Sequence, residues 1–239
     1  MNKVSSALPL WPLALLAGLL PAAASLIALA LYTLHTGVWC NPFVDDCVSI
    51  SRMARTGIAN PIFRALVLPA AALQALLWIL LAQTLLALGP VRRQALLMAT
   101  IGVVAALALI VYGTFLGTEG DVYRWLRRRG TITYFGGSYI ALLLFARMLQ
   151  QLQQSGMLLL PRPLWNTLLA LLGFIASLGL VHGFAALARM KALEDRIENL
   201  TEWWGSLAMT AVFVLIAGLI RRWRLAATLQ MQPPPATPR

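Results

Sequence analysis

Charged residues, and acids in particular, are scarce in this sequence. Asp, Glu, Lys and Arg make up 11% of its 239 residues, whereas about a quarter is usual for a soluble domain. The chain is also 60% hydrophobic, with a mean hydropathy of +0.77. This composition excludes an ordinary soluble domain and indicates an integral membrane protein.

Histidines are almost absent, and this limits the chemistry available to the chain. Two histidines, His35 and His182, cannot build a three-histidine metal site. The sequence also lacks a nucleophile elbow, a zinc-protease motif and a phosphate-binding glycine loop. We therefore predict no metal and no other cofactor, and the missing motifs favour a role other than catalysis.

Only two cysteines are present, and both lie in one polar segment. Cys40 and Cys47 are separated by six residues. If the segment faces an oxidising compartment, we expect them to form a disulfide. Two unrelated free thiols are the alternative.

Long apolar runs fill most of the chain. A helix needs about 20 apolar residues to cross a membrane, so we predict an all-α, polytopic membrane helix bundle with six transmembrane helices in one domain, residues 1–224. The predicted spans are 7–34, 65–88, 95–117, 131–149, 164–188 and 203–220. The proline-rich residues 225–239 are predicted to be disordered.

The first run resembles a signal peptide, but it is too long for the apolar core of one. We therefore expect an uncleaved span. Pro21 should bend it, because the proline ring removes one backbone N–H and clashes with the preceding turn.

The positions of the acidic residues distinguish the two sides of the membrane. All eight lie in segments that follow odd-numbered spans, whereas Lys and Arg divide almost equally between the sides, so the positive-inside rule does not decide the orientation. The side with both termini is purely basic, as expected beside an anionic cytoplasmic leaflet. We predict cytoplasmic termini and external acid-containing segments, in a bacterial inner membrane or a plasma membrane.

The external segments are rich in arginine, and a guanidinium binds phosphate through two parallel hydrogen bonds. The same arginines could instead pair with the nearby acids or be solvated. Because the basic residues flank membrane spans, anionic lipid is the expected counter-charge and nucleic acid is not an expected partner. The candidate ligand-binding residues are Arg52, Arg55, Glu119, Asp121, Arg124, Arg127, His182 and Glu202.

Two of these candidates allow a second interpretation. His182 lies inside the fifth run, where an ionisable residue is often functional, but a neutral imidazole needs only one hydrogen bond there. Glu202 opens the sixth run, where the helix dipole alone favours a carboxylate, and the tryptophans that follow it fit a membrane interface.

Three short motifs resemble those of the DRAM-like family of six-span membrane proteins, which includes the damage-regulated autophagy modulators and relatives in lipid and GPI-anchor remodelling. The motifs are Ile50-Ser51 with Gly57 and Pro61-Ile62-Phe63, then Gly130 with Phe135 and Tyr139, and finally Glu202-Trp203. The resemblance implies a function in the membrane that involves lipids, and it implies no particular reaction. Arg52 and Arg127 stand where the family often has an acid and a histidine, so the roles of those two residues do not carry over.

We expect a membrane protein whose charged outer cap recognises a lipid or lipid-linked head group, anionic or phosphate-bearing, or scaffolds a membrane protein that does. One alternative is an intramembrane lipid-modifying enzyme in which Glu202 and His182 act as acid and base, which requires both in one cavity. Another is a small transporter, although the spans lack the paired broken segments and buried acids typical of that class.

Overall fold

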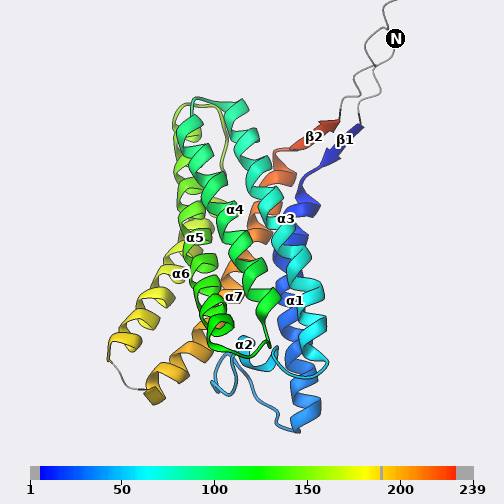
Figure 1. The fold of residues 1–239 in the computed structure, drawn as a ribbon. Coiled ribbons are helices and arrows are strands. Elements are labelled where there is room, and N and C mark those ends of the chain that lie inside the picture. The colour runs from blue at the N-terminus through cyan, green and yellow to red at the C-terminus, as the bar shows by residue number, and fades with distance from the viewer. Residues whose placement is uncertain (1–5, 189–190, 230–239) are drawn as a thin grey trace, which may run out of the picture.

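The computed structural model describes residues 6–188 and 191–229. This part of the chain forms seven helices and one pair of short strands (Figure 1). The helices are α1 Trp11–Thr36, α2 Ile50–Met53, α3 Ala59–Leu88, α4 Arg92–Phe115, α5 Asp121–Gln154, α6 Arg162–Ala188 and α7 Lys191–Arg222, and the strands are β1 Ser6–Pro9 and β2 Ala226–Leu229.

Six of the helices in the described residues are long and apolar enough to cross a membrane, namely all except α2. This confirms the predicted all-α bundle with six spans. The six long helices alternate in direction (Figure 1), so segment 37–58 and the turn 116–120 lie at one end of the bundle. The opposite end carries segments 89–91 and 155–161 together with both strands.

The two strands bring the ends of the described chain together. β1 and β2 are antiparallel, with Ser6 opposite Leu229 and Pro9 opposite Ala226. Ala226–Leu229 belong to the segment predicted to be disordered, and β1 supplies the backbone partners that make a strand there possible. The remaining tail residues, 230–239, lie outside the described residues.

Several helices extend beyond the predicted spans at the α2 end of the bundle. α5 begins at Asp121 rather than at residue 131, and α7 begins at Lys191 rather than at residue 203. Hydropathy marks where contact with lipid ends, whereas a helix continues as long as its backbone hydrogen bonds can form. Two polar segments outside the predicted spans are therefore largely helical extensions of the bundle.

Buried aromatic and aliphatic side chains hold the bundle together. In the larger cluster, Trp78 on α3 packs edge-on against Phe213 on α7, with ring centroids 6.2 Å apart. The indole of Trp78 lies directly against Gly102, where a Cβ would overlap the ring. α6 packs along α7 and only lightly against α5, so it is the least buried of the six long helices.

Candidate functional site

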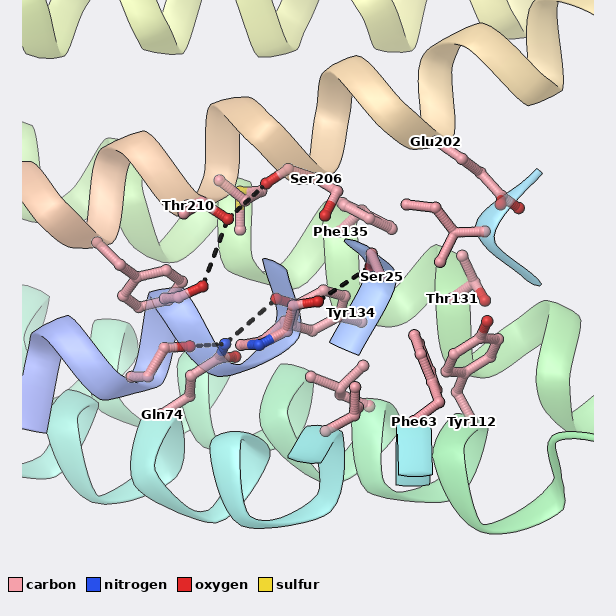
Figure 2. A pocket seen from close by; sticks show the side chains of 18 residues that line it. Ser25, Phe63, Gln74, Tyr112, Thr131, Tyr134, Phe135, Glu202, Ser206 and Thr210 are labelled. Atoms are coloured by element: carbon pink, nitrogen blue, oxygen red, sulfur yellow. Dashed lines mark hydrogen bonds between the residues drawn. The ribbon is translucent and has the colours of Figure 1, made fainter. Parts of the chain in front are cut away.

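A cavity of about 70 Å³ lies inside the bundle, between α1, α3, α4, α5 and α7 (Figure 2). Its lining on α7 extends from Glu202 to Phe213, about 16 Å along a helix. Most of its walls are apolar, but eight polar side chains line it: Ser25, Gln74, Tyr112, Thr131, Tyr134, Glu202, Ser206 and Thr210. The site is therefore a mainly apolar cavity with several polar side chains, within the membrane-spanning part of the protein.

One end of the cavity, called here the inner end because it lies away from α2, contains the buried side chain of Gln74. Its Nε2 donates to the carbonyl oxygen of Ala17 at 2.9 Å and to the hydroxyl oxygen of Tyr134 at 3.4 Å. Ala17 lies four residues before Pro21, which has no N–H, so the helix leaves this carbonyl without its usual donor. The side chain of Gln74 is only 1% exposed, and the position of both acceptors fixes which end of its amide is the nitrogen.

Glu202 occupies the opposite, outer end of the cavity, on the side of Tyr112 and Thr131 (Figure 2). Its Oε2 accepts a hydrogen bond from the backbone N–H of Ser51 at 3.0 Å. Ile50, the neighbour of Ser51, lines the cavity as well. α2 therefore covers the outer end of the cavity and is attached to α7 through the carboxylate of Glu202.

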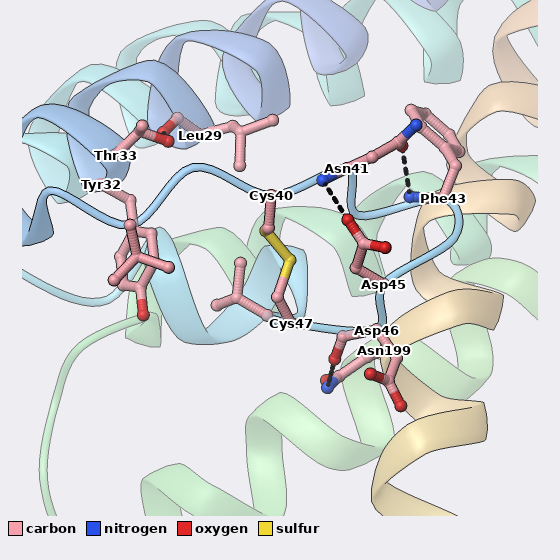
Figure 3. The surroundings of a disulfide bond; sticks show 12 residues. Leu29, Tyr32, Thr33, Cys40, Asn41, Phe43, Asp45, Asp46, Cys47 and Asn199 are labelled. Atoms are coloured by element: carbon pink, nitrogen blue, oxygen red, sulfur yellow. Dashed lines mark hydrogen bonds between the residues drawn. A yellow bond between two sulfur atoms is a disulfide. The ribbon is translucent and has the colours of Figure 1, made fainter.

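The segment before α2 is closed by a disulfide between Cys40 and Cys47 (Figure 3), in agreement with the predicted pairing. Within the ring, the N–H of Asn41 donates to Oδ2 of Asp45 at 2.8 Å. The side-chain Oδ1 of Asn41 accepts from the N–H of Phe43 at 3.1 Å. These bonds order the loop between the cysteines.

Two tryptophans of α7 hold this loop. The indole N–H of Trp203 donates to the carbonyl of Val48 at 2.9 Å, and that of Trp204 donates to the carbonyl of Phe43 at 3.1 Å. The ring of Phe43 also packs edge-on against both indoles, at centroid distances of 5.4 and 5.2 Å. The interfacial tryptophans expected from the sequence are thus structural anchors for the cap.

Asp46 adds a third attachment of the loop to α7. Its carbonyl accepts a hydrogen bond from Nδ2 of Asn199 at 2.6 Å, and its carboxylate pairs with Nε of Arg196 at 2.8 Å. Asn199 is buried, so this contact is largely shielded from solvent. The bond between Ser51 and Glu202 joins two of the three motifs on which the family resemblance rests.

The remaining motif, Gly130 with Phe135 and Tyr139, has a packing role. Gly130 on α5 lies where a Cβ would come within 2.9 Å of the carbonyl oxygen of Ala108 on α4. Only a glycine allows α4 and α5 to approach so closely at this point. Phe135 lines the cavity, and Tyr139 packs against the larger core cluster.

The predicted arginines divide into structural and exposed groups. Nη1 of Arg127 donates to the carbonyl of Phe115 at 3.0 Å and to the carbonyl of Thr118, so it caps the C-terminus of α4. Nε of Arg55 donates to the carbonyl of Ser51 at 2.8 Å. Burial lowers the pKa of Arg127, and the positive charges of Arg55 and Arg124 lower it further.

The other predicted residues at this end are exposed. Asp121 and Arg124 form the expected ion pair at 3.5 Å, but an ion pair in water contributes little stability. Glu119 lies in the turn before α5, and Arg52 lies on α2; both are exposed. Neither acid of the second polar segment lines the cavity.

His182 lies apart from Glu202. It is exposed, and its Nδ1 lies 3.5 Å from the hydroxyl of Thr201, on the side of α7 that faces α6. There a separate apolar groove of about 360 Å³ is lined by Phe174, Leu178, Val181, Ile197, Leu200, Thr201 and Trp204. Since Glu202 points into the cavity on a different face of α7, the two side chains do not meet in one cavity as the enzyme alternative requires.

Most of the polar lining of the cavity was missed from the sequence. Single polar residues within apolar runs form much of this lining, for example Ser25, Tyr134 and Thr210. The sequence pattern does not predict that they line one cavity. One signal was present, because Pro21 implies an unpaired carbonyl and Gln74 is one of two polar interruptions of its run.

The six long helices, the disulfide-closed cap and the internal polar cavity define a multi-pass helical membrane protein. In residues 6–188 and 191–229, no group of three or more His, Cys, Asp and Glu side chains is placed to hold a metal ion. We found no match to the chain among protein-family models, curated proteins or solved structures. The resemblance to the DRAM-like family therefore stays a prediction.

Proposed function

We propose that this membrane protein binds the phosphate-bearing head group of an anionic or lipid-linked membrane molecule at the α2 end of the bundle. We place this end outside the cytoplasm because the opposite end is purely basic, as is typical of segments beside an anionic cytoplasmic leaflet. Arg52, Arg55 and Arg124 are the residues that we expect to contact the head group.

The observation that carries the proposal is the convergence of Arg55, Arg124 and Arg127. The backbone carbonyl of Arg55 lies beside Gly117, and Arg127 bonds to the carbonyl of the adjacent Thr118, so both residues meet at the turn after α4. Arg124 precedes Arg127 by three residues on α5. The charges of Arg55 and Arg124 lower the pKa of Arg127, in addition to the larger effect of its burial. Among the described residues, only Arg124 of these three has a carboxylate within ion-pair distance. A phosphate would relieve this repulsion, since it can accept hydrogen bonds from several guanidinium groups at once.

The position of the cluster also fits a lipid ligand. Arg127 bonds to the carbonyl of Phe115, the last residue of the apolar helix α4. The cluster therefore lies at the boundary between the apolar helices and the polar cap, at the depth where the head groups of a bilayer are found. Each arginine near such a surface adds about 1 kcal/mol of attraction to anionic lipid.

Native mass spectrometry of the detergent-extracted protein tests the proposal, with phosphatidylglycerol as the added probe. The test variant combines Arg52→Gln, Arg55→Gln and Arg124→Gln, which leaves the α4 cap made by Arg127 intact. A matched control replaces three exposed arginines of the opposite end, through Arg92→Gln, Arg93→Gln and Arg222→Gln.

We expect the test variant to retain no more than about one tenth of the lipid that the wild type retains. The control has the same net charge and should lose much less. Equal retention by the wild type and the test variant would contradict the proposal. A wild type that retains no lipid would favour the scaffold role instead.

A further inference from the structure

The inner end of the cavity contains two hydrogen-bonding groups that the protein leaves incomplete. Oε1 of Gln74 has no hydrogen-bond partner in the part of the chain that the structure describes. The hydroxyl of Tyr134 accepts from Nε2 of Gln74, and within the same residues its own proton has no acceptor. Both side chains line the cavity and are buried, at 1% and 7% exposure.

Buried polar groups that lack a hydrogen-bond partner are unfavourable inside a protein. Leaving a buried donor or acceptor unpaired destabilises the folded protein, and in a membrane no bulk water reaches the site to compensate. The amide of Gln74 cannot turn to relieve the problem, because its nitrogen is already committed to Ala17 and Tyr134. The missing partner must therefore enter the cavity from outside the chain.

The chemistry of the two groups defines that partner. Oε1 of Gln74 requires a donor, whereas the proton of Tyr134 requires an acceptor, so one partner that serves both must be able to donate and accept. A hydroxyl group does both. No charged side chain lines the inner end, since Glu202 lies at the outer end, and a charged partner would be left without compensation.

The volume of the cavity also limits the size of the partner that can bind. The whole cavity, of which the inner end is one part, has a volume of about 70 Å³, and a cavity needs about 10–15 Å³ of such volume to hold one water. There is therefore room for water, or for the terminal hydroxyl of a narrow chain.

We propose that the inner end of the cavity, beside the helical hydrogen bond that Pro21 removes from α1, is a binding site for a small neutral hydroxyl group. Water and the alcohol end of a membrane amphiphile are the two sources of this chemistry. Either would accept from Tyr134 and donate to Gln74. The site is independent of the arginine cluster, because it uses none of the same side chains.

Nuclear magnetic resonance on the protein labelled with ¹⁵N at glutamine tests the water source. The side-chain amide signal of Gln74 is assigned by its loss in Gln74→Leu. We expect it to show a cross peak to water in the wild type. If Gln74→Leu does not fold, Tyr134→Phe gives the assignment through a shift of the same signal.

Thermal unfolding tests the alcohol source, with 1-decanol compared against methyl nonyl ether, an isomer without a donor. We expect the alcohol to raise the melting temperature of the wild type by about 2–4 °C more than the ether does. This difference should vanish in Gln74→Leu and Tyr134→Phe. It should persist in Gln83→Leu, because Gln83 is exposed on the other side of α3.

A water cross peak without a preference for the alcohol identifies water as the ligand. A preference for the alcohol that depends on Gln74 identifies an amphiphile. The proposal is overturned if Gln74 shows no water contact and the alcohol acts no better than the ether. It is likewise overturned if there is no water contact and the effect of the alcohol survives in Gln74→Leu.

Discussion

The side-chain amide of Gln74 on α3 donates to the carbonyl oxygen of Ala17 on α1 across 2.9 Å. Pro21 leaves that oxygen without a helical donor, because its ring nitrogen carries no hydrogen. In the apolar part of a membrane no water can take the place of the missing N–H. Gln74 therefore completes the hydrogen bonding of a helix to which it does not belong.

This relationship predicts coupling between Gln74 and Pro21. Gln74→Leu should lower the free energy of unfolding by about 1 kcal/mol, the usual range for hydrogen bonds between membrane helices. In a Pro21→Ala background the new N–H can bond to Ala17, so the same substitution should cost less than half as much. A double-mutant cycle in detergent-induced unfolding measures the difference, and equal costs in both backgrounds would argue against the coupling.

The two tryptophans of the cap should differ in importance. Trp203 is 2% exposed and Trp204 is 37% exposed, so the hydrogen bond of Trp203 to Val48 is the better shielded of the two. Trp203→Phe should cost about 1–2 kcal/mol and Trp204→Phe less than that. Hydrogen exchange of the loop amides near Val48 reports the loosening, and similar exchange in the two variants would contradict this ranking.

Arg127 and Arg128 provide a matched pair on α5. Arg127 bonds to two carbonyls at the end of α4, whereas Arg128 is exposed. Arg127→Met should therefore destabilise the protein by about 1–2 kcal/mol, while Arg128→Met should change stability by less than about 0.5 kcal/mol. Thermal unfolding of both variants tests this, and equal losses would show that charge alone matters.

The disulfide should be present in the purified protein and should stabilise it. Neither Cys40 nor Cys47 should react with a maleimide until a reductant is added. Replacing both by serine should lower the free energy of unfolding by roughly 2–3 kcal/mol, because the open loop gains conformational entropy. Two reactive thiols in the unreduced protein would contradict the pairing.

Hydropathy was sufficient to predict the six spans, because each needs only a long apolar run. It could not give the helix ends. α5 and α7 continue into polar sequence, where their backbones still form helical hydrogen bonds while their side chains leave the lipid. The strand Ala226–Leu229 was not predicted either, since its partner lies at the other end of the chain.

The cavity shows why a membrane site is harder to predict than a membrane span. Gln74 and Gln83 interrupt the same apolar run and are nine residues apart, which places them on opposite faces of a helix. One is buried in the cavity and the other is exposed. The sequence shows that one of the two faces inward, but only the packing of α1 and α5 decides which.

The enzyme alternative required Glu202 and His182 to converge, and the sequence could not decide this for the same reason. Both side chains lie toward the α2 end of the bundle. Their distance depends on the rotation of α6 and α7 about their axes, which single polar residues do not specify. Glu202 faces α2 and the cavity, whereas His182 contacts Thr201 on the side of the α6–α7 groove.

The orientation of the bundle in the membrane is tested most directly by cysteine labelling in intact cells. Val44 and Met157 are suitable positions, because both are well exposed, at 64% and 58%, and lie at opposite ends of the bundle. A membrane-impermeant maleimide should label Val44→Cys in intact cells and Met157→Cys only after permeabilisation. The reverse pattern would place the arginine cluster and the disulfide in the cytoplasm and contradict an external head-group site.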